Sequence, residues 1–220
     1  MTFWRFIVIL ATLGVGYHIF HDTSQIDSIR DKVSDILTFN RIKYRQGMLV
    51  ANGPTQVPVN KNAFANGKYS IKPVAYFSVK ARVLAKERYF FDRESSLSPY
   101  DIVVGWRQMS DQTFVDNIGF SQGLRIYSYS FDIPGFKVST ISHNSANIHI
   151  IPANEKIAEI VGNLKNGDMV LMVGYLVTVT GEDGWVWRSS LLRDDLGEKS
   201  GELLWLDQIQ VLTDSYPKIK

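Results

Sequence analysis

The stretch STISHNSANIHIIPAN, residues 139–154, decides how the C-terminal half of the chain is organised. It contains His143 and His149, two of the four histidines, within the densest run of uncharged hydrogen-bonding side chains in the protein. On an extended strand, alternate side chains point to opposite faces. Ser145, Asn147 and His149 would therefore form one polar row that faces away from an apolar row. The apolar row consists of Ala146, Ile148 and Ile150.

A helix and three strands are predicted directly after this stretch. Asn154 is a favourable N-cap, the residues after it carry an apolar stripe at helical spacing, and Gly167 stands at the expected C-terminal cap. The stripe consists of Ile157, Ile160, Val161 and Leu164. The segments MVLMVGYLVTVT (169–180), WVWRSSLL (185–192) and ELLWLDQIQVL (202–212) then predict three consecutive antiparallel strands, of which the first is buried.

Two earlier segments also alternate as strands do. In residues 75–85 the odd positions are apolar and most even positions are polar, and residues 124–131 (LRIYSYSF) alternate similarly. Between them we expect two short helices, one beginning at Pro99 and one capped by Asp111. Residues 52–67 combine Gly, Pro and Asn without periodicity, which predicts an irregular entry to the domain.

These elements predict an α+β fold class, with a β-rich domain, a mainly antiparallel sheet and short helices. The sheet could curl into a small barrel resembling the oligonucleotide/oligosaccharide-binding (OB) fold. With 220 residues, 45% of them hydrophobic, the chain can bury a core. We expect a transmembrane anchor (1–23), a juxtamembrane amphipathic helix (24–40), a linker (41–68) and a globular domain (69–214).

The anchor is predicted from Phe3 to Phe20, where Arg5 and His18 are the strongly polar side chains. As a helix this segment rises roughly 27 Å, close to the ~30 Å hydrocarbon thickness of a bilayer. A cleaved signal peptide and a buried soluble helix are the alternatives. Arg5 favours a cytoplasmic N-terminus and a periplasmic location for the bulk of the chain at a bacterial inner membrane, although basic residues after the span oppose this orientation.

Composition excludes several classes of site. The net charge of +2, from 24 Lys and Arg against 22 Asp and Glu, predicts no polyanionic partner by itself. The absence of cysteine excludes disulfides, zinc–thiolate sites and cysteine nucleophiles. No phosphate-binding loop, zinc-protease, EF-hand or nucleophile-elbow motif is present, so we predict no cofactor and no metal.

Three strings resemble a pattern of uncharacterised bacterial proteins that have one N-terminal membrane segment. They are SPYDIVVGWRQMSD (98–111), SANIHIIPA (145–153) and GYLV (174–177). The resemblance covers residues 75–211 and implies no activity and no functional residue.

The polar row gives the first candidate site, that of a membrane-tethered hydrolase. His149 would act as general base, with a serine nucleophile and an orienting carboxylate. The nucleophile candidates are Ser145 and Ser121, the carboxylate candidates are Asp101, Asp111 and Asp194, and Asn147 is a further member. His143 lies about 20 Å from His149 along one strand, so the two could bind one metal ion only if the chain turned between them. Alternatively, the row satisfies backbone groups at a strand end.

A basic and aromatic sheet face gives the second candidate site. Arginine and tyrosine side chains can stack on nucleobases or sugars, although cross-strand packing and a solvated edge would use the same residues. The candidates are Lys80, Arg82, Arg125, Tyr127 and Tyr129.

Anchor, amphipathic helix and β-rich domain together favour a single-pass, membrane-anchored interaction or assembly module of a bacterial envelope complex rather than an enzyme. Its expected partners are the lipid bilayer, through Phe3 to Phe20, and a protein neighbour or second copy. A nucleic-acid partner is not favoured.

Overall fold

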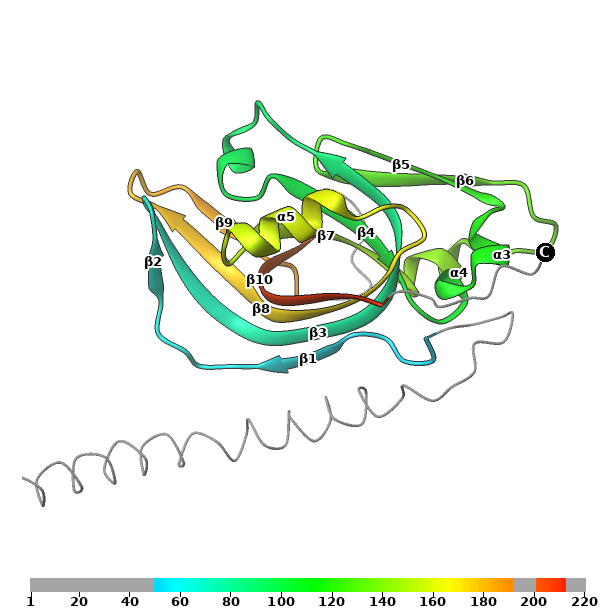
Figure 1. Cartoon of the computed structure of the whole chain (residues 1–220), viewed down its shortest axis with the longest axis horizontal. Helices are drawn as coiled ribbons and strands as arrows, with labels where there is room; N and C mark the ends of the chain where they lie inside the picture. Colours follow the sequence, from blue (N-terminus) through cyan, green and yellow to red (C-terminus); the bar gives the residue numbers. More distant parts are fainter. Residues whose placement is uncertain (1–49, 192–200, 213–220) are drawn as a thin grey trace, which may run out of the picture. The chain divides into compact units, whose positions relative to one another are not determined.

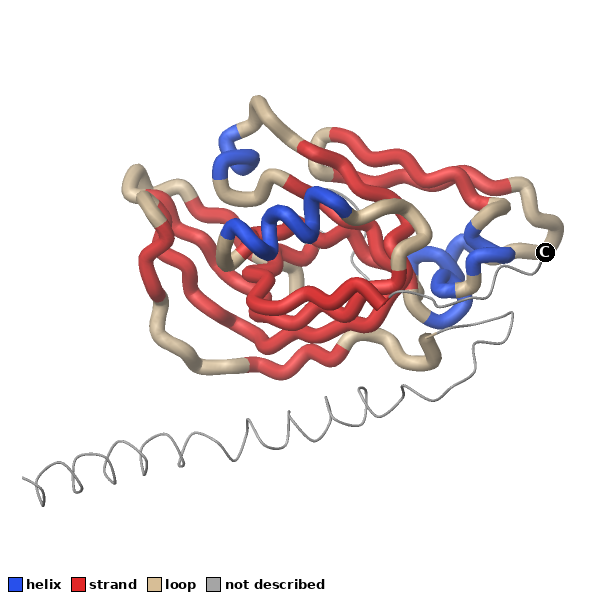
Figure 2. The backbone as a smooth tube through the Cα atoms, viewed as in Figure 1, coloured by secondary structure: helices blue, strands red, loops and turns tan. Residues whose placement is uncertain are grey.

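The computed structural model describes residues 50–191 and 201–212, and these form a domain that is mostly strand (Figures 1 and 2). The strands are β1 (Thr55–Pro58), β2 (Phe64–Asn66), β3 (Tyr69–Arg88), β4 (Tyr100–Gly105), β5 (Ile118–Gly123), β6 (Ile126–Phe131), β7 (Ser145–Pro152), β8 (Met169–Gly181), β9 (Val186–Arg188) and β10 (Glu202–Leu212). The helices are α3 (Gln112–Val115), α4 (Val138–Ser142) and α5 (Glu155–Asn163), with 3₁₀ turns η1 (Arg93–Ser96) and η2 (Arg107–Ser110). A β-rich domain with few short helices is confirmed.

Five strands pair in a closed ring. β3 pairs with β4, β4 with β7, β7 with β10, β10 with β8, and β8 with β3 again. All of these pairings are antiparallel except that of β7 with β10, which is parallel. The predicted mainly antiparallel sheet is therefore confirmed, but β10 is not simply the third strand of an antiparallel series. We call β3, β4, β7, β10 and β8 the five-stranded ring.

The central cluster of the core receives side chains from every strand of the ring. Phe77, Ile102, Ile148, Met172 and Leu204 come from β3, β4, β7, β8 and β10 respectively, and each is fully buried. α5 adds its apolar stripe to the same cluster and lies across the ring in Figure 1. The Asn154 side chain accepts a hydrogen bond from Ile157 N, so the predicted N-cap is confirmed.

The hairpin β5–β6 covers the outer face of the ring where β3 and β4 pair. Its aromatic side chains pack with Leu84, Val103 and Ile141 in a second buried cluster. The ladder of β3 and β4 shifts between Val83 and Ala85, so Leu84 and Ala85 both belong to this outer cluster. The bulge explains why the alternation of residues 75–85 breaks at Leu84.

Residues 100–105 form strand β4 instead of the helix predicted to begin at Pro99. The Ser98–Asp101 pattern resembles a helix start, but the following run of β-branched residues has two buried faces. Ile102 and Val104 enter the central cluster, whereas Val103 enters the outer one. Packing on both faces outweighs the local capping signal.

Other predicted elements differ in detail. Residues 52–67 contain β1 and β2, both paired with β3. α5 ends at Asn163, and Gly167 has a φ of 95° in the turn before β8 rather than at the helix end. α3 has the predicted Asp111 cap but is only one turn long. The predicted anchor and amphipathic helix lie outside the described residues; within those residues, no helix combines the length and hydropathy that a membrane span requires.

Candidate functional site

The polar row predicted on the histidine stretch exists, but the protein buries it. Ser145, Asn147 and His149 on β7 point to the outer face of the ring, opposite Ile148 and Ile150 of the central cluster. Each is about 95% buried, with 5% of its surface exposed. The β5–β6 hairpin lies over this row, which therefore makes internal contacts instead of facing solvent.

His143 does not belong to the row. It follows α4 as an exposed C-cap residue, because the chain turns at Asn144 before β7 begins. The two histidines of the opening stretch are therefore separated by a change of element.

Asp101, Asp92, Arg125 and His149 form a network of charged and polar groups, which we call the Arg125 cluster; Asp101 and His149 are buried, and Arg125 and Asp92 are partly exposed. Arg125 donates from Nε to Asp92 Oδ2 at 2.7 Å and from Nη2 to Asp92 Oδ1 at 2.9 Å. Its Nη1 donates to Asp101 Oδ1 at 2.7 Å and to the carbonyl of Ser98 at 2.9 Å. Two carboxylates thus share one guanidinium, and Asp101 is fully buried.

The pairing of strands brings Asp101 and His149 together. β4 and β7 are antiparallel, and Asp101 and His149 are directly opposite each other in register. His149 Nδ1 lies 2.9 Å from Asp101 Oδ1, but this contact does not have hydrogen-bonding alignment. The two atoms are therefore close without an aligned N–H between them, unlike the carboxylate–histidine pair of a hydrolase.

The other ring nitrogen of His149 lies against the backbone of residue 201. A Cβ placed on Gly201 would collide with His149 Nε2, so the chain before β10 fits against that atom only because residue 201 is glycine. Trp187 packs on the same imidazole, with ring centroids 5.2 Å apart. A general base needs a nitrogen that faces a nucleophile, whereas Nε2 lies against Gly201, which has no nucleophilic side chain.

Ser145 and Asn147 bind the chain's own backbone and hairpin. Ser145 donates to the carbonyl of Ile141 at 2.7 Å, so Tyr127, 3.2 Å away, is the donor to Ser145 Oγ. Asn147 donates to the carbonyl of Arg125 at 3.0 Å and accepts from Gln122 at 2.9 Å. Both side chains therefore hydrogen-bond to backbone carbonyls, as expected if the row satisfies backbone groups rather than forming a catalytic site.

Electrostatics around Arg125 follow from burial and pairing. Burial opposes the charge of Arg125, but its bonds to Asp92 and Asp101 outweigh that effect and raise its pKa. Hydrogen bonds from Arg125 lower the pKa of Asp92 below its ordinary value. Tyr89, whose ring centroid lies 3.9 Å from the guanidinium carbon, has a pKa raised to about 12, first by burial and then by the Asp101 charge.

The remaining predicted residues are dispersed. Arg82 is buried and donates to the carbonyls of Ser110 and Gly167, while Tyr129 packs in the outer cluster. Asp111 caps α3. Lys80 lies on β3, Ser121 is an exposed residue of β5, and Asp194 is outside the described residues. No continuous basic and aromatic binding face results from the described residues.

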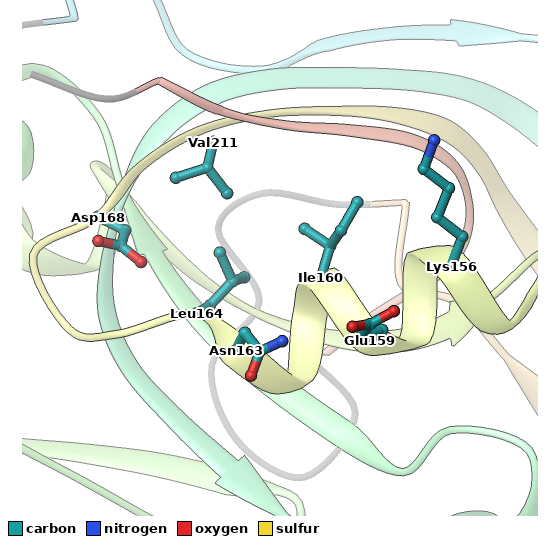
Figure 3. Close-up of a pocket in the computed structure, with 7 residues that line it drawn as sticks. All are labelled: Lys156, Glu159, Ile160, Asn163, Leu164, Asp168 and Val211. Atoms are coloured by element: carbon teal, nitrogen blue, oxygen red, sulfur yellow. The ribbon is translucent and has the colours of Figure 1, made fainter.

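A cavity of about 390 Å³ lies beside α5 (Figure 3). Its lining residues are Lys156, Glu159, Ile160, Asn163, Leu164, Asp168 and Val211. In the view of Figure 3, Lys156 and Asp168 stand at opposite ends, with apolar side chains between them. The lining includes neither histidine nor serine and none of the residues of the Arg125 cluster.

Sequence reasoning named Asp101, Arg125 and His149 but missed Asp92, Tyr89 and Gly201. Asp92 and Tyr89 lie in the β3–β4 connection, and their role depends on the hairpin turn that places Arg125 between them. The strand register alone could have paired Asp101 with His149 once β4 was recognised as a strand.

Across residues 50–191 and 201–212, no three histidine or acidic side chains are grouped as a metal site would require. No protein-family model, curated protein or solved structure matches the chain.

Proposed function

We propose that this chain is a single-pass, membrane-anchored interaction or assembly module of a bacterial envelope complex, built on a barrel of the OB type. The order of the five-stranded ring supports the barrel assignment. Counted along the chain, β3, β4, β7, β8 and β10 are the first to fifth strands of the ring. Around the ring they follow the order first, second, third, fifth, fourth and back to first, and the third and fifth strands are parallel. α5 connects the third strand to the fourth, as the helix of an OB barrel does.

One observation carries the proposal: the hairpin β5–β6 occupies the face that OB barrels use for ligands. That face is formed by the second and third strands. Here those strands are β4 and β7, and their outer polar groups bond to the hairpin through Gln122, Tyr127 and Arg125. A barrel whose ligand face is filled by its own chain is better suited to contacts made by its loops and edges.

The same contacts argue against the two alternative functions. Hydrolysis by His149 would need a nucleophile at Nε2, which instead lies against Gly201. Nucleic-acid or glycan binding would need exposed Arg125 and tyrosine side chains, but Arg125 holds two carboxylates. We therefore place neither activity at this face.

The test compares the full-length chain with a chain that keeps only residues 1–49, in cells of the source organism. Both are treated with a membrane-permeant crosslinker, and membranes are then washed with alkali. We expect a discrete crosslinked species that requires residues 50–220 and remains in the alkali-resistant fraction. A chain that stays monomeric, or that alkali releases, would contradict the proposal.

A further inference from the structure

Four exposed apolar side chains are found at the tips of two neighbouring connections. Phe91 is 100% exposed, Leu124 90%, Phe90 60% and Ile126 38%. Phe90 and Phe91 belong to the β3–β4 connection, Leu124 belongs to the turn of the β5–β6 hairpin, and Ile126 is the first residue of β6. We call these four residues the apex.

Arg125 joins the two connections. Its backbone N donates to the hydroxyl of Tyr89, and its side chain holds Asp92 at 2.7 Å. Tyr89 and Asp92 directly flank the two phenylalanines, whereas Arg125 stands between Leu124 and Ile126. Figure 1 shows the β3–β4 connection and the hairpin turn at the same edge of the domain. The apex is therefore one surface, held together by the partly buried contacts of Arg125.

The hairpin turn is strained in a way that displays Leu124. Leu124 and Arg125 have φ values of 52° and 64°, in the left-handed region that favours glycine or asparagine. Strain of this kind persists where the surrounding structure enforces it, and it concentrates at functional positions. The ion pairs of Arg125 offset the strain of its backbone. The Leu124 side chain is exposed and offers no comparable stabilisation of the fold. We therefore expect the Leu124 side chain to contact a partner outside the chain.

Size favours a lipid surface over a protein partner. Since an aromatic side chain buries about 150–250 Å², the apex offers on the order of 500 Å² of apolar surface. A stable protein interface needs about 800 Å² from each partner and a complementary shape. A bilayer interface, in contrast, surrounds projecting side chains without a matching surface.

We propose that the apex inserts into the interfacial region of the lipid bilayer. This inference rests on the proposed anchor, which would hold the domain within reach of a membrane. Arg88 lies beside the apex with its guanidinium carbon 4.6 Å from the Phe90 ring, where it could meet a lipid phosphate. Glu87 and Glu94 are also nearby in sequence, so apolar insertion rather than net charge drives the contact.

The absence of cysteine from the chain allows a direct test with single-cysteine probes. Leu124→Cys reports on the apex, and Val138→Cys on α4 is the matched control, since Val138 is also apolar and 53% exposed. Each full-length variant is labelled with a bimane fluorophore and reconstituted into phosphatidylethanolamine and phosphatidylglycerol vesicles that contain nitroxide lipids. We expect several-fold stronger quenching at position 124 than at position 138.

Replacing Phe90 and Phe91 together by serine should reduce the quenching at position 124, because two phenyl groups contribute at least about tenfold to partition. Equal quenching at positions 124 and 138, or quenching unaffected by the serines, would overturn the proposal. If lipid quenching is absent and the unlabelled Leu124→Cys variant forms a disulfide-linked dimer when a mild oxidant such as copper phenanthroline is added, the apex would be assigned to a second copy instead.

Alkaline extraction of the same vesicles separates this inference from the anchor. If alkali releases the chain although position 124 had been quenched, the apex proposal stands and the proposed anchor is contradicted. If the chain resists extraction but position 124 is not quenched, the proposed anchor stands and the apex proposal is contradicted.

Discussion

Arg125 is the residue on which the outer layer of the domain depends. It neutralises Asp92 and Asp101, packs against Tyr89 and accepts Asn147 at its own carbonyl. Its position in a left-handed turn is tolerated because these contacts determine it from several sides. The residue thus connects the hairpin, the β3–β4 connection and the ring.

We expect Arg125→Met to destabilise the domain by about 3–5 kcal/mol, because the buried Asp101 would lose the cation that compensates its charge. The measurement is urea unfolding followed by tryptophan fluorescence. Arg93→Met is the control: Arg93 pairs with Asp183, but both side chains are largely exposed, at 41% and 59%. Exposed pairs contribute little to stability because solvent screens them. Similar losses for the two variants would contradict the role of Arg125.

The Asp92 carboxylate should make stability depend on acid pH. Hydrogen bonds from Arg125 lower its pKa from the ordinary value of 3.8. The unfolded state therefore binds a proton at a higher pH than the folded state. The stabilisation is complete above a pH of 3.8 and is lost as the pH falls toward the lower pKa of the folded state. Asp92→Asn should therefore reduce stability near neutral pH and flatten the decline below pH 3.8.

Urea midpoints across the acid range check this expectation. Asp183, whose pKa is lowered to about 2 by Arg93, contributes to the slope in both proteins. An identical slope in wild type and Asp92→Asn would mean that Asp92 does not contribute.

Gly201 tests whether His149 is a packing residue. Gly201→Ala should cost about 1–3 kcal/mol because its methyl group would collide with His149 Nε2. Gly123→Ala is the control, since nothing lies within 4 Å of the added Cβ there. In a His149→Ala background the cost of Gly201→Ala should largely disappear. An undiminished cost in the double variant would place the strain elsewhere.

Among the elements, α5 is held at both ends by side chains. Asn154 caps its N-terminus, and Lys86 from β3 donates to the carbonyls of Gly162 and Leu164, each at 2.6 Å. Lys86 also lies 3.4 Å from the carbonyl of Val161. A cation at the last carbonyls of a helix satisfies groups that have no intrahelical partner and complements the dipole.

Lys86→Met should therefore loosen the C-terminal turn of α5 and destabilise the domain by about 1–3 kcal/mol. Amide hydrogen exchange measures the local effect, which should be largest in residues 160–164. Lys72→Met, an exposed lysine on the same strand, is the control. Unchanged exchange in α5 would show that water replaces the lysine without cost.

Local signals predicted α5 well and β4 poorly. Asn154 and the apolar stripe are read from neighbouring residues, and the helix depends on the same neighbours. β4 depends on distant partners, because Val103 is buried against Ile141 and the hairpin aromatics. The Arg125 cluster has the same limitation: Asp92 and Asp101 meet Arg125 across 33 and 24 positions of sequence.

At the scale of the whole molecule, ring closure depends on long-range pairing that alternation cannot specify. Residue patterns identified β8 and β10 as strands but left open that β10 would also lie parallel to β7. In the closed ring each of the five strands pairs with two others, and β1, β2 and β9 add further pairs to β3 and β8. The closed ring also lets one central cluster collect side chains from every strand.

Gly174 tests whether this closure makes the domain one cooperative unit. It lies where the β8–β10 ladder shifts between Leu206 and Gln208, and an added Cβ would collide with the backbone of Trp205. Gly174→Ala should therefore force β10 from β8 and cost several kcal/mol, on the order of a severe core substitution. If the ring folds as a unit, urea midpoints from tryptophan fluorescence and from amide exchange in β4 should fall together, with Gly123→Ala unchanged. A loss confined to β10, with β4 protection intact, would mean that the ring opens locally and that closure is not the basis of its stability.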